Sequence, residues 1–246
     1  MTPEEMVARV LYRDGLMLVI DKPAGMPVHR GPKGGGALED HFDALRFGLP
    51  RRPSLAHRLD RETTGCLVLG RHRKALATLG SLFKHNKIGK TYWALVEGGP
   101  EGVAGGIDLP LAKRDVDRGW WMKVDPEGLP ASTAWRVLGR MPTPDGKGLT
   151  WLELEPLTGR THQLRVHCAA MGWPILGDNI YGTAPREGVP GLHLHARQIV
   201  IPIQRNRPPV TVVAPVPEHM RERFAACGWP GDAPKSEGET AQAATS

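Results

Sequence analysis

The chain has 246 residues, of which 40% are hydrophobic and 24% charged, and this is typical of a globular protein with a sizeable core. Its longest apolar runs, LMLVI and CLVL, are too short to cross a bilayer, and the N-terminus lacks the pattern of a signal peptide. Three widely spaced cysteines argue against a disulfide framework or a thiolate zinc site, so a cytoplasmic location is expected. The net charge of +6 favours a polyanionic partner only weakly.

The predicted elements begin with a strand in LMLVIDKPAG, which a Pro-Gly turn closes. GPKGGGALED is expected to be a flexible loop, and its glycine-rich part at residues 31–37 is a candidate mobile loop over a cleft. A second, buried strand follows in TGCLVLGRH. Apolar residues then recur at helical spacing from Arg73 to His85, where a basic C-terminal end suits the helix dipole.

The second half of the chain is predicted to be richer in strands. KTYWALVEG has the aromatic and β-branched content of a strand, and STAWRVLGR and LTWLELEPL follow as two more. RTHQLRVHCAAMG predicts a helix with Leu164, Cys168 and Met171 on its apolar face and Gly172 as its end. LHLHARQIVIPI and PVTVVAP are the last strands. Roughly eight strands and a few helices in mixed order indicate an α+β fold.

Several kinds of site are disfavoured by the motifs that the sequence lacks. It contains no glycine-rich phosphate loop and no GxSxG nucleophile elbow. His193 and His195 would share one face of a strand, but no spaced carboxylate or thiolate completes a set of metal ligands. A metal site is therefore not expected, and a metal-dependent hydrolase remains a rival that a loss of activity on chelation would reveal.

The stretch HRLDRETTG places Asp60 among basic side chains just before a buried strand. Seven Arg or Lys residues against two acids lie between Arg51 and Lys74, which fits either a solvated charged face or a surface that follows phosphates. Asp60 alone would fit a surface ion pair. Arg165, at the start of a buried helix, could pair with a recessed carboxylate. Tyr92 fits either a half-buried strand aromatic or the floor of a cleft.

Taken together, these stretches resemble the RluA-type family of RNA pseudouridine synthases. HRLDRETTG resembles the family's aspartate motif, KTYWALV its tyrosine motif and GRTHQLRVHCAAMGWPILGDNIYG its arginine motif. DKPAGMPVH and LHLHA also match family segments in the expected order, so the resemblance covers roughly residues 10–215. It implies one catalytic domain over residues 1–229, and the polar tail at 230–246 is expected to be disordered.

The resemblance implies the pseudouridine synthase fold: a mixed, largely antiparallel β-sheet core with flanking helices and a central RNA-binding cleft. It also implies isomerisation of uridine in tRNA or rRNA without a cofactor or metal. Asp60 would be the catalytic carboxylate, Arg165 its charged partner and Tyr92 the residue that stacks on the base. Arg58 would fill the space left by a flipped base. The full set of implied RNA contacts is Lys22, His57, Arg58, Arg61, Arg160 and His162.

The sequence also departs from the family pattern. Many relatives carry an S4 RNA-binding domain before the catalytic domain, whereas about ten residues precede the first match here, which favours a tRNA or a small stem-loop as substrate. Thr64 stands where Ser is usual, and RQIVIPI replaces the usual residues after Ala196. A monomer is expected. The alternative is a non-catalytic RNA-binding or ribosome-assembly protein on the same fold.

Overall fold

The computed structural model describes residues 1–31, 34–114, 121–185, 191–204 and 206–232. The described chain forms two compact units, each of which contains segments that are distant in the sequence. Unit 1 comprises Met1–Gly89, Ala196–Pro215 and the described residues from Gly231 onward, and unit 2 comprises Lys90–His195 and Val216–Pro230. The single domain over residues 1–229 stays a prediction.

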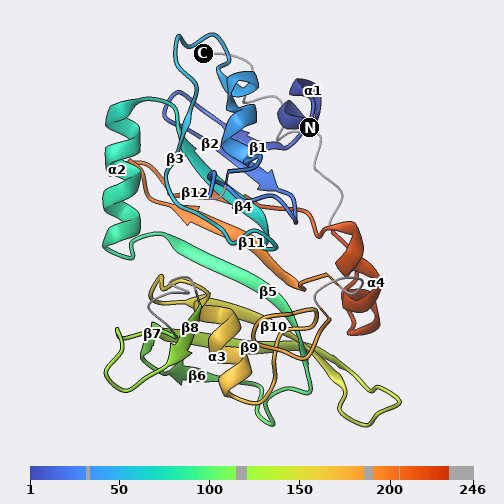
Figure 1. Cartoon of the computed structure of the whole chain (residues 1–246). Helices are drawn as coiled ribbons and strands as arrows, with labels where there is room; N and C mark the ends of the chain where they lie inside the picture. Colours follow the sequence, from blue (N-terminus) through green and yellow to red (C-terminus); the bar gives the residue numbers. More distant parts are fainter. Residues whose placement is uncertain (32–33, 115–120, 186–190, 205, 233–246) are drawn as a thin grey trace. The chain divides into compact units, whose positions relative to one another are not determined.

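Unit 1 is a sheet with one long helix beside it. Its strands have the order β1-β2-β4-β11, with β3 next to β4 and β12 next to β11, and α2 lies against β4 (Figure 1). In chain order, the elements that contribute to this unit are α1 (Pro3–Val7), β1 (Val10–Arg13), β2 (Met17–Lys22), the 3-10 helix η1 (Leu38–Leu45), β3 (Ser54–Leu55), β4 (Thr64–Gly70), α2 (Arg73–Lys84), β11 (Leu194–Ile201, from Ala196 onward) and β12 (Val210–Val213).

The core of unit 1 explains why these segments form strands and a helix. All seven residues of β4 are buried, as the continuous apolar run predicts, and β2 pairs with it antiparallel from Met17↔Gly70 to Lys22↔Gly65. The helix α2 turns Ala75 and Leu79 into the core at the predicted spacing. The two strands and the helix are therefore confirmed.

Two features of unit 1 differ from the prediction. GPKGGGALED was expected to be loop throughout, but its last three residues belong to η1, which buries Leu38, Phe42 and Leu45. Residues 32 and 33 of the glycine-rich segment lie outside the described residues. Most of the predicted tail does so as well, although Asp232 at its start forms an ion pair with Arg197 at 2.6 Å.

Unit 2 is an antiparallel sheet of strand order β5-β10-β9-β6 with a separate β7-β8 hairpin and the helix α3 beside β10 (Figure 1). In chain order, its elements are β5 (Gly89–Glu97, from Lys90 onward), β6 (Ala104–Asp108), β7 (Leu111–Lys113), β8 (Met122–Val124), β9 (Ser132–Met141), β10 (Leu149–Pro156), α3 (Gln163–Ala170) and α4 (Glu218–Ala226).

The core of unit 2 confirms the apolar face of α3 only in part. Leu164 and Cys168 are buried against β5 and β10 residues, but Met171 follows the helix end and is 46% exposed. Gly172 has a φ of +84°, the left-handed conformation expected where a helix stops. The helix α4, which the sequence reading missed, buries Met220 and Phe224 against an aromatic cluster with Trp151.

These two units make an α+β fold with a mixed, mostly antiparallel sheet and few helices, as the sequence predicts. Among the described residues, no helix is long and apolar enough to cross a membrane.

Candidate active site

Asp60 lies in a tight turn that directly precedes β4. The Thr63 amide donates to the Asp60 carbonyl at 3.2 Å and closes the turn. Leu59 on one side and Thr63 on the other are buried, while Asp60 itself is partly exposed. The buried Leu59 and Thr63 thus hold the backbone of this turn against the core of unit 1.

Lys22 fastens this turn to the end of β2. Its side chain is fully buried, and its ammonium donates to the carbonyl oxygens of Pro23 (2.8 Å), Arg61 (2.8 Å) and Thr63 (2.9 Å). Burial lowers the pKa of Lys22 to about 8, and the negative charges of Glu62, Asp60 and Asp21 oppose part of that shift. This positioning role differs from the RNA contact predicted for Lys22.

The remaining predicted residues of unit 1 surround the same turn. Arg61 donates from Nε to the Gly25 carbonyl at 2.9 Å, which joins the turn to the DKPAG segment. His57 accepts the Val68 amide at Nε2 (3.0 Å), so that nitrogen carries no proton, and its ring stacks on Phe83 with 4.4 Å between centroids. Arg58 is exposed. Unit 1 therefore gathers five of the predicted residues around one turn, and the RNA contacts of the three surface residues stay predictions.

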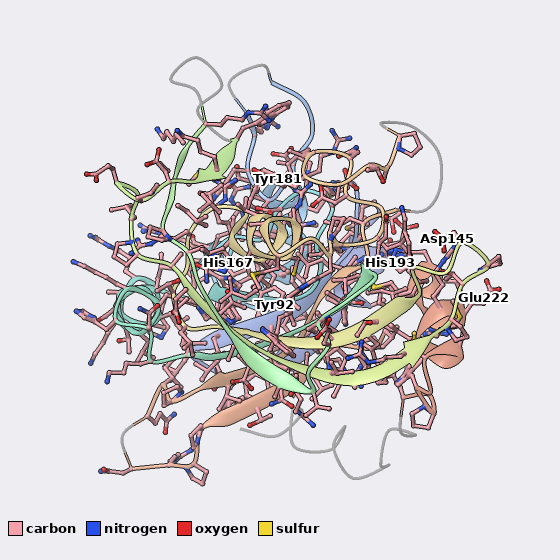
Figure 2. The ribbon with its side chains drawn as sticks, turned by 90° about the horizontal axis from the view of Figure 1, so that it is seen from below. Tyr92, Asp145, His167, Tyr181, His193 and Glu222 are labelled. Carbon is pink, nitrogen blue, oxygen red and sulfur yellow. The ribbon has the colours of Figure 1, made fainter. Side chains whose placement is uncertain are left out.

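Tyr92 occupies a half-buried position on β5. It is labelled in Figure 2, pairs with Leu154 of β10, and packs against the core cluster of unit 2 that contains Leu164 and Cys168. Lys90, two residues earlier, donates to the Thr158 carbonyl at 3.5 Å, and burial lowers the pKa of its ammonium. Lys90 thus connects β5, the strand that carries Tyr92, to the turn that leads into α3.

Gln163 organises the turn GRTHQ at the start of α3. Its side-chain oxygen accepts the Thr158 hydroxyl (2.7 Å) and the Arg160 amide (3.0 Å), and its nitrogen donates to the Ser132 carbonyl (2.9 Å) and the Thr133 hydroxyl (3.0 Å). Arg160 itself is exposed and donates from Nε to the Pro130 carbonyl at 3.0 Å. Its predicted contact with RNA stays a prediction.

Arg165, the third residue of α3, has a buried carboxylate partner within its own unit. Its Nε and Nη2 donate to the two oxygens of Asp178 at 2.8 and 2.7 Å, and the side chains are 4% and 0% exposed. Burial alone would raise the pKa of Asp178, but the hydrogen bonds and charge of Arg165 outweigh it and hold that pKa below its ordinary value. The pair predicted between Arg165 and Asp60 involves residues of two different units and stays a prediction.

The sequence reading did not single out two residues of this arrangement, Asp178 and Tyr181. The ring of Tyr181, which Figure 2 labels, lies 5.3 Å from the Arg165 guanidinium carbon, and its hydroxyl contacts His162 Nδ1 at 2.8 Å. Both residues lie in GDNIYG, the last part of the long arginine motif, and the available signal was an acid and an aromatic residue that follow Arg165 in that motif. Among the described residues, no three His, Cys, Asp or Glu side chains are grouped so that they could hold a metal ion.

Known proteins resemble this chain over most of its length. The family model described as RNA pseudouridylate synthase matches residues 16–170. An uncharacterized RNA pseudouridine synthase of Zymomonas mobilis is 42% identical over 85% of this chain and 94% of its own length. The ribosomal large subunit pseudouridine synthase C of Vibrio cholerae is 33% identical over 87% of this chain and 67% of its own length.

A solved structure agrees with these sequence matches. Human RNA pseudouridylate synthase domain containing 4 is similar with a TM-score of 0.76 and 28% identity, over 92% of this chain and 95% of that one. The matched segments include the Asp60 turn, the Tyr92 strand and the Arg165 helix described above. The chain is therefore an RNA pseudouridine synthase, an isomerase, and belongs to the RluA-type family of these enzymes.

Proposed function

We propose that this enzyme isomerises specific uridines in a structured RNA, a tRNA or an rRNA stem-loop, with Asp60 as the essential carboxylate. The observation that carries the proposal is the rigid support of the Asp60 turn. A fully buried ammonium, that of Lys22, donates to two carbonyls of the turn, and Leu59 and Thr63 of the same turn are buried. Such support is what a reacting group needs to stay in a productive geometry.

The isomerisation has a simple balance of bonds. The bond between N1 of uracil and C1′ of ribose breaks, the base turns, and a bond between C5 and C1′ forms. C5 loses a proton and N1 gains one, so no electrons and no further reactant are required. A carboxylate can act in this sequence as a nucleophile at the sugar or as a base, and Asp60 is assigned one of these two roles.

The roles of Arg165 and Tyr92 follow from the needs of that carboxylate. In a pocket that excludes water, a carboxylate tends to take up a proton, and a nearby guanidinium keeps it ionised. Arg165 is assigned this role toward Asp60 because it stands in the arginine motif of the family, as Asp60 stands in the aspartate motif. Tyr92 is assigned to stack on the uracil ring, with its hydroxyl near C5.

The RNA must present its uridine outside the base stack. An enzyme cannot reach the atoms of a stacked base, and unstacking costs a few kcal/mol. Arg58 is exposed and lies two residues before Asp60, a place from which its side chain could fill the vacated space. Arg61, Arg160, His57 and His162 are proposed as further contacts with the RNA. A cytoplasmic site of action and a monomeric enzyme are part of the same proposal.

The test is the release of tritium from RNA labelled at uridine C5, with total tRNA and rRNA offered separately. The wild type should release tritium from one pool, and Asp60→Asn, which keeps the size of the side chain but removes its charge, should release none while retaining affinity for RNA. Glu62→Gln makes the same chemical change in the same turn and serves as the matched control, with near wild-type release expected. Turnover by Asp60→Asn at the wild-type rate would reject the assignment.

The same assay addresses the alternative of a non-catalytic RNA-binding or ribosome-assembly role. Binding of RNA without tritium release from either pool, by a wild-type protein shown to be folded, would favour that alternative. Release from one pool only identifies the class of substrate, and mapping of the modified position within that pool then names the uridine.

A further inference from the structure

The carboxylate of Asp178 is buried and saturated with hydrogen bonds. Its Oδ2 accepts Arg165 Nε, and its Oδ1 accepts Arg165 Nη2 together with the amides of Ile180 (2.9 Å) and Tyr181 (3.0 Å). Asp178 thus ties the α3 side chain to the backbone of its own loop. Because both carboxylate oxygens are engaged, the plane of the guanidinium is fixed as well as its distance.

Tyr181 constrains the guanidinium from a second direction. Its ring lies 5.3 Å from the Arg165 guanidinium carbon, within the range of a cation–π contact. Its hydroxyl accepts the Met122 amide at 3.0 Å and contacts His162 Nδ1 at 2.8 Å. His162 is the N-cap of α3, with a φ of +53°, so the hydroxyl joins the helix start to Met122 of β8.

We propose that Asp178 and Tyr181 are positioning residues that hold the Arg165 guanidinium in one orientation for catalysis. The proposal rests on the catalytic role proposed above for Arg165. An arginine side chain has several rotatable bonds, and an unrestrained guanidinium would sample many orientations at a large cost in side-chain entropy on every turnover. A bidentate carboxylate in its plane and a ring beside it remove that freedom before the substrate arrives.

Stability alone explains this arrangement poorly. Replacement of a buried ion pair by apolar residues of similar volume is often neutral or stabilising, so a buried Arg–Asp pair is weak support for a purely structural role. By contrast, Arg136 and Glu153 of the same unit form an ion pair at 2.7 Å whose side chains are 60% and 20% exposed. The buried pair is thus built for a defined geometry of one guanidinium.

The central test is Asp178→Asn, which keeps the size of the side chain and removes its charge. We expect kcat in the tritium-release assay to fall by about 100-fold, the loss typical of a misplaced reacting group, with KM for RNA nearly unchanged. Tyr181→Phe keeps the ring and removes the hydroxyl, and it should lower kcat by a smaller factor, again with little effect on KM. Glu153→Gln is the matched control and should leave kcat unchanged.

A double-mutant cycle shows whether Asp178 acts through Arg165. If it does, Asp178→Asn combined with Arg165→Met should be no slower than Arg165→Met alone, because the group to be positioned is already gone. Additive losses would overturn the proposal, and so would a folded Asp178→Asn variant with wild-type kcat. If Asp178→Asn does not fold, Asp178→Glu and Tyr181→Phe provide the test, because both variants keep the charged pair. Wild-type kcat in both would overturn the proposal. Lowered kcat at constant KM would support it.

A measurement without substrate separates this proposal from the proposed function. In NMR spectra of arginine-labelled protein, the Nε–H of Arg165 should exchange slowly with solvent in the wild type and in Asp60→Asn, and rapidly in Asp178→Asn. Slow exchange retained in Asp178→Asn would contradict the positioning role. Turnover retained by Asp60→Asn and Arg165→Met would instead reject the proposed function, whatever the exchange measurement gave.

Discussion

Gly65→Ala is the substitution whose cost is best defined by the structure. Gly65 is the second residue of β4, pairs with Lys22 of β2 and has a φ of +102°, a conformation that side chains with a Cβ rarely adopt. A Cβ at this position would lie 2.8 Å from the carbonyl carbon of Ala196 and closer still to its oxygen. The obstacle is therefore the backbone of β11, which cannot move aside as a flexible side chain could.

The expected cost is the sum of two effects. The unfavourable φ costs about 1–3 kcal/mol. Overpacking of a buried site costs about another 1–3 kcal/mol, because β4 or β11 must shift to make room. We expect Gly65→Ala to lower the free energy of unfolding by about 4 kcal/mol, a large part of the 5–15 kcal/mol typical of a folded protein. A shift of β4 would also move Gly65, the residue that pairs with Lys22, and with it the Asp60 turn that Lys22 supports. Turnover per folded molecule should therefore fall too.

Urea unfolding followed by circular dichroism measures this cost, and the tritium-release assay on the folded fraction measures turnover. Gly80→Ala is the matched control, because Gly80 lies within α2 and a Cβ there meets nothing within 4 Å. In a helix interior this change should stabilise the protein by about 0.5–1 kcal/mol. A Gly65→Ala protein as stable as the wild type would refute the close approach of Ala196 to Gly65.

Three further predictions concern buried charged or titratable groups. Lys22→Met leaves three carbonyl acceptors without their donor and should lower the unfolding free energy by about 3 kcal/mol in urea titrations, with loss of tritium release. Burial raises the pKa of Asp21 to about 6, so the contribution of Asp21 to the free energy of unfolding should fall as the pH rises from about 4 to 6, and Asp21→Asn should be more stable than the wild type at pH 7 by about 2 kcal/mol. Burial lowers the pKa of His193 to about 4, so the unfolded state binds a proton first as the pH falls from about 6.5, and the contribution of His193 to the free energy of unfolding should decline by about 3 kcal/mol by pH 4, opposite in sign to that of Asp21. His193→Gln should remove that decline in urea unfolding curves recorded across this range, and an unchanged slope would contradict the assignment.

The sequence alone was sufficient for the elements with strong local patterns. The unbroken apolar run of β4 and the helical spacing of Ala75 and Leu79 determine burial through side chains that are close in sequence. Elements with weak local patterns were not predicted. The 3-10 helix η1 follows a glycine-rich stretch, β7 and β8 span three residues each, and the apolar residues of α4 do not recur at clear helical spacing. In such short or weakly periodic segments, contacts from elsewhere in the chain select the conformation.

The candidate site shows the same difference between what local sequence predicts and what the fold decides. Asp60, Tyr92 and Arg165 could be named from the sequence, because each stands in a motif that resembles a family pattern. Only the folded chain could give Arg165 the partner Asp178, thirteen positions away, and give Lys22 its carbonyl acceptors 39 and 41 positions away. A sequence specifies which charges exist, but the desolvation that makes each one require a particular partner arises only when packing excludes water around it.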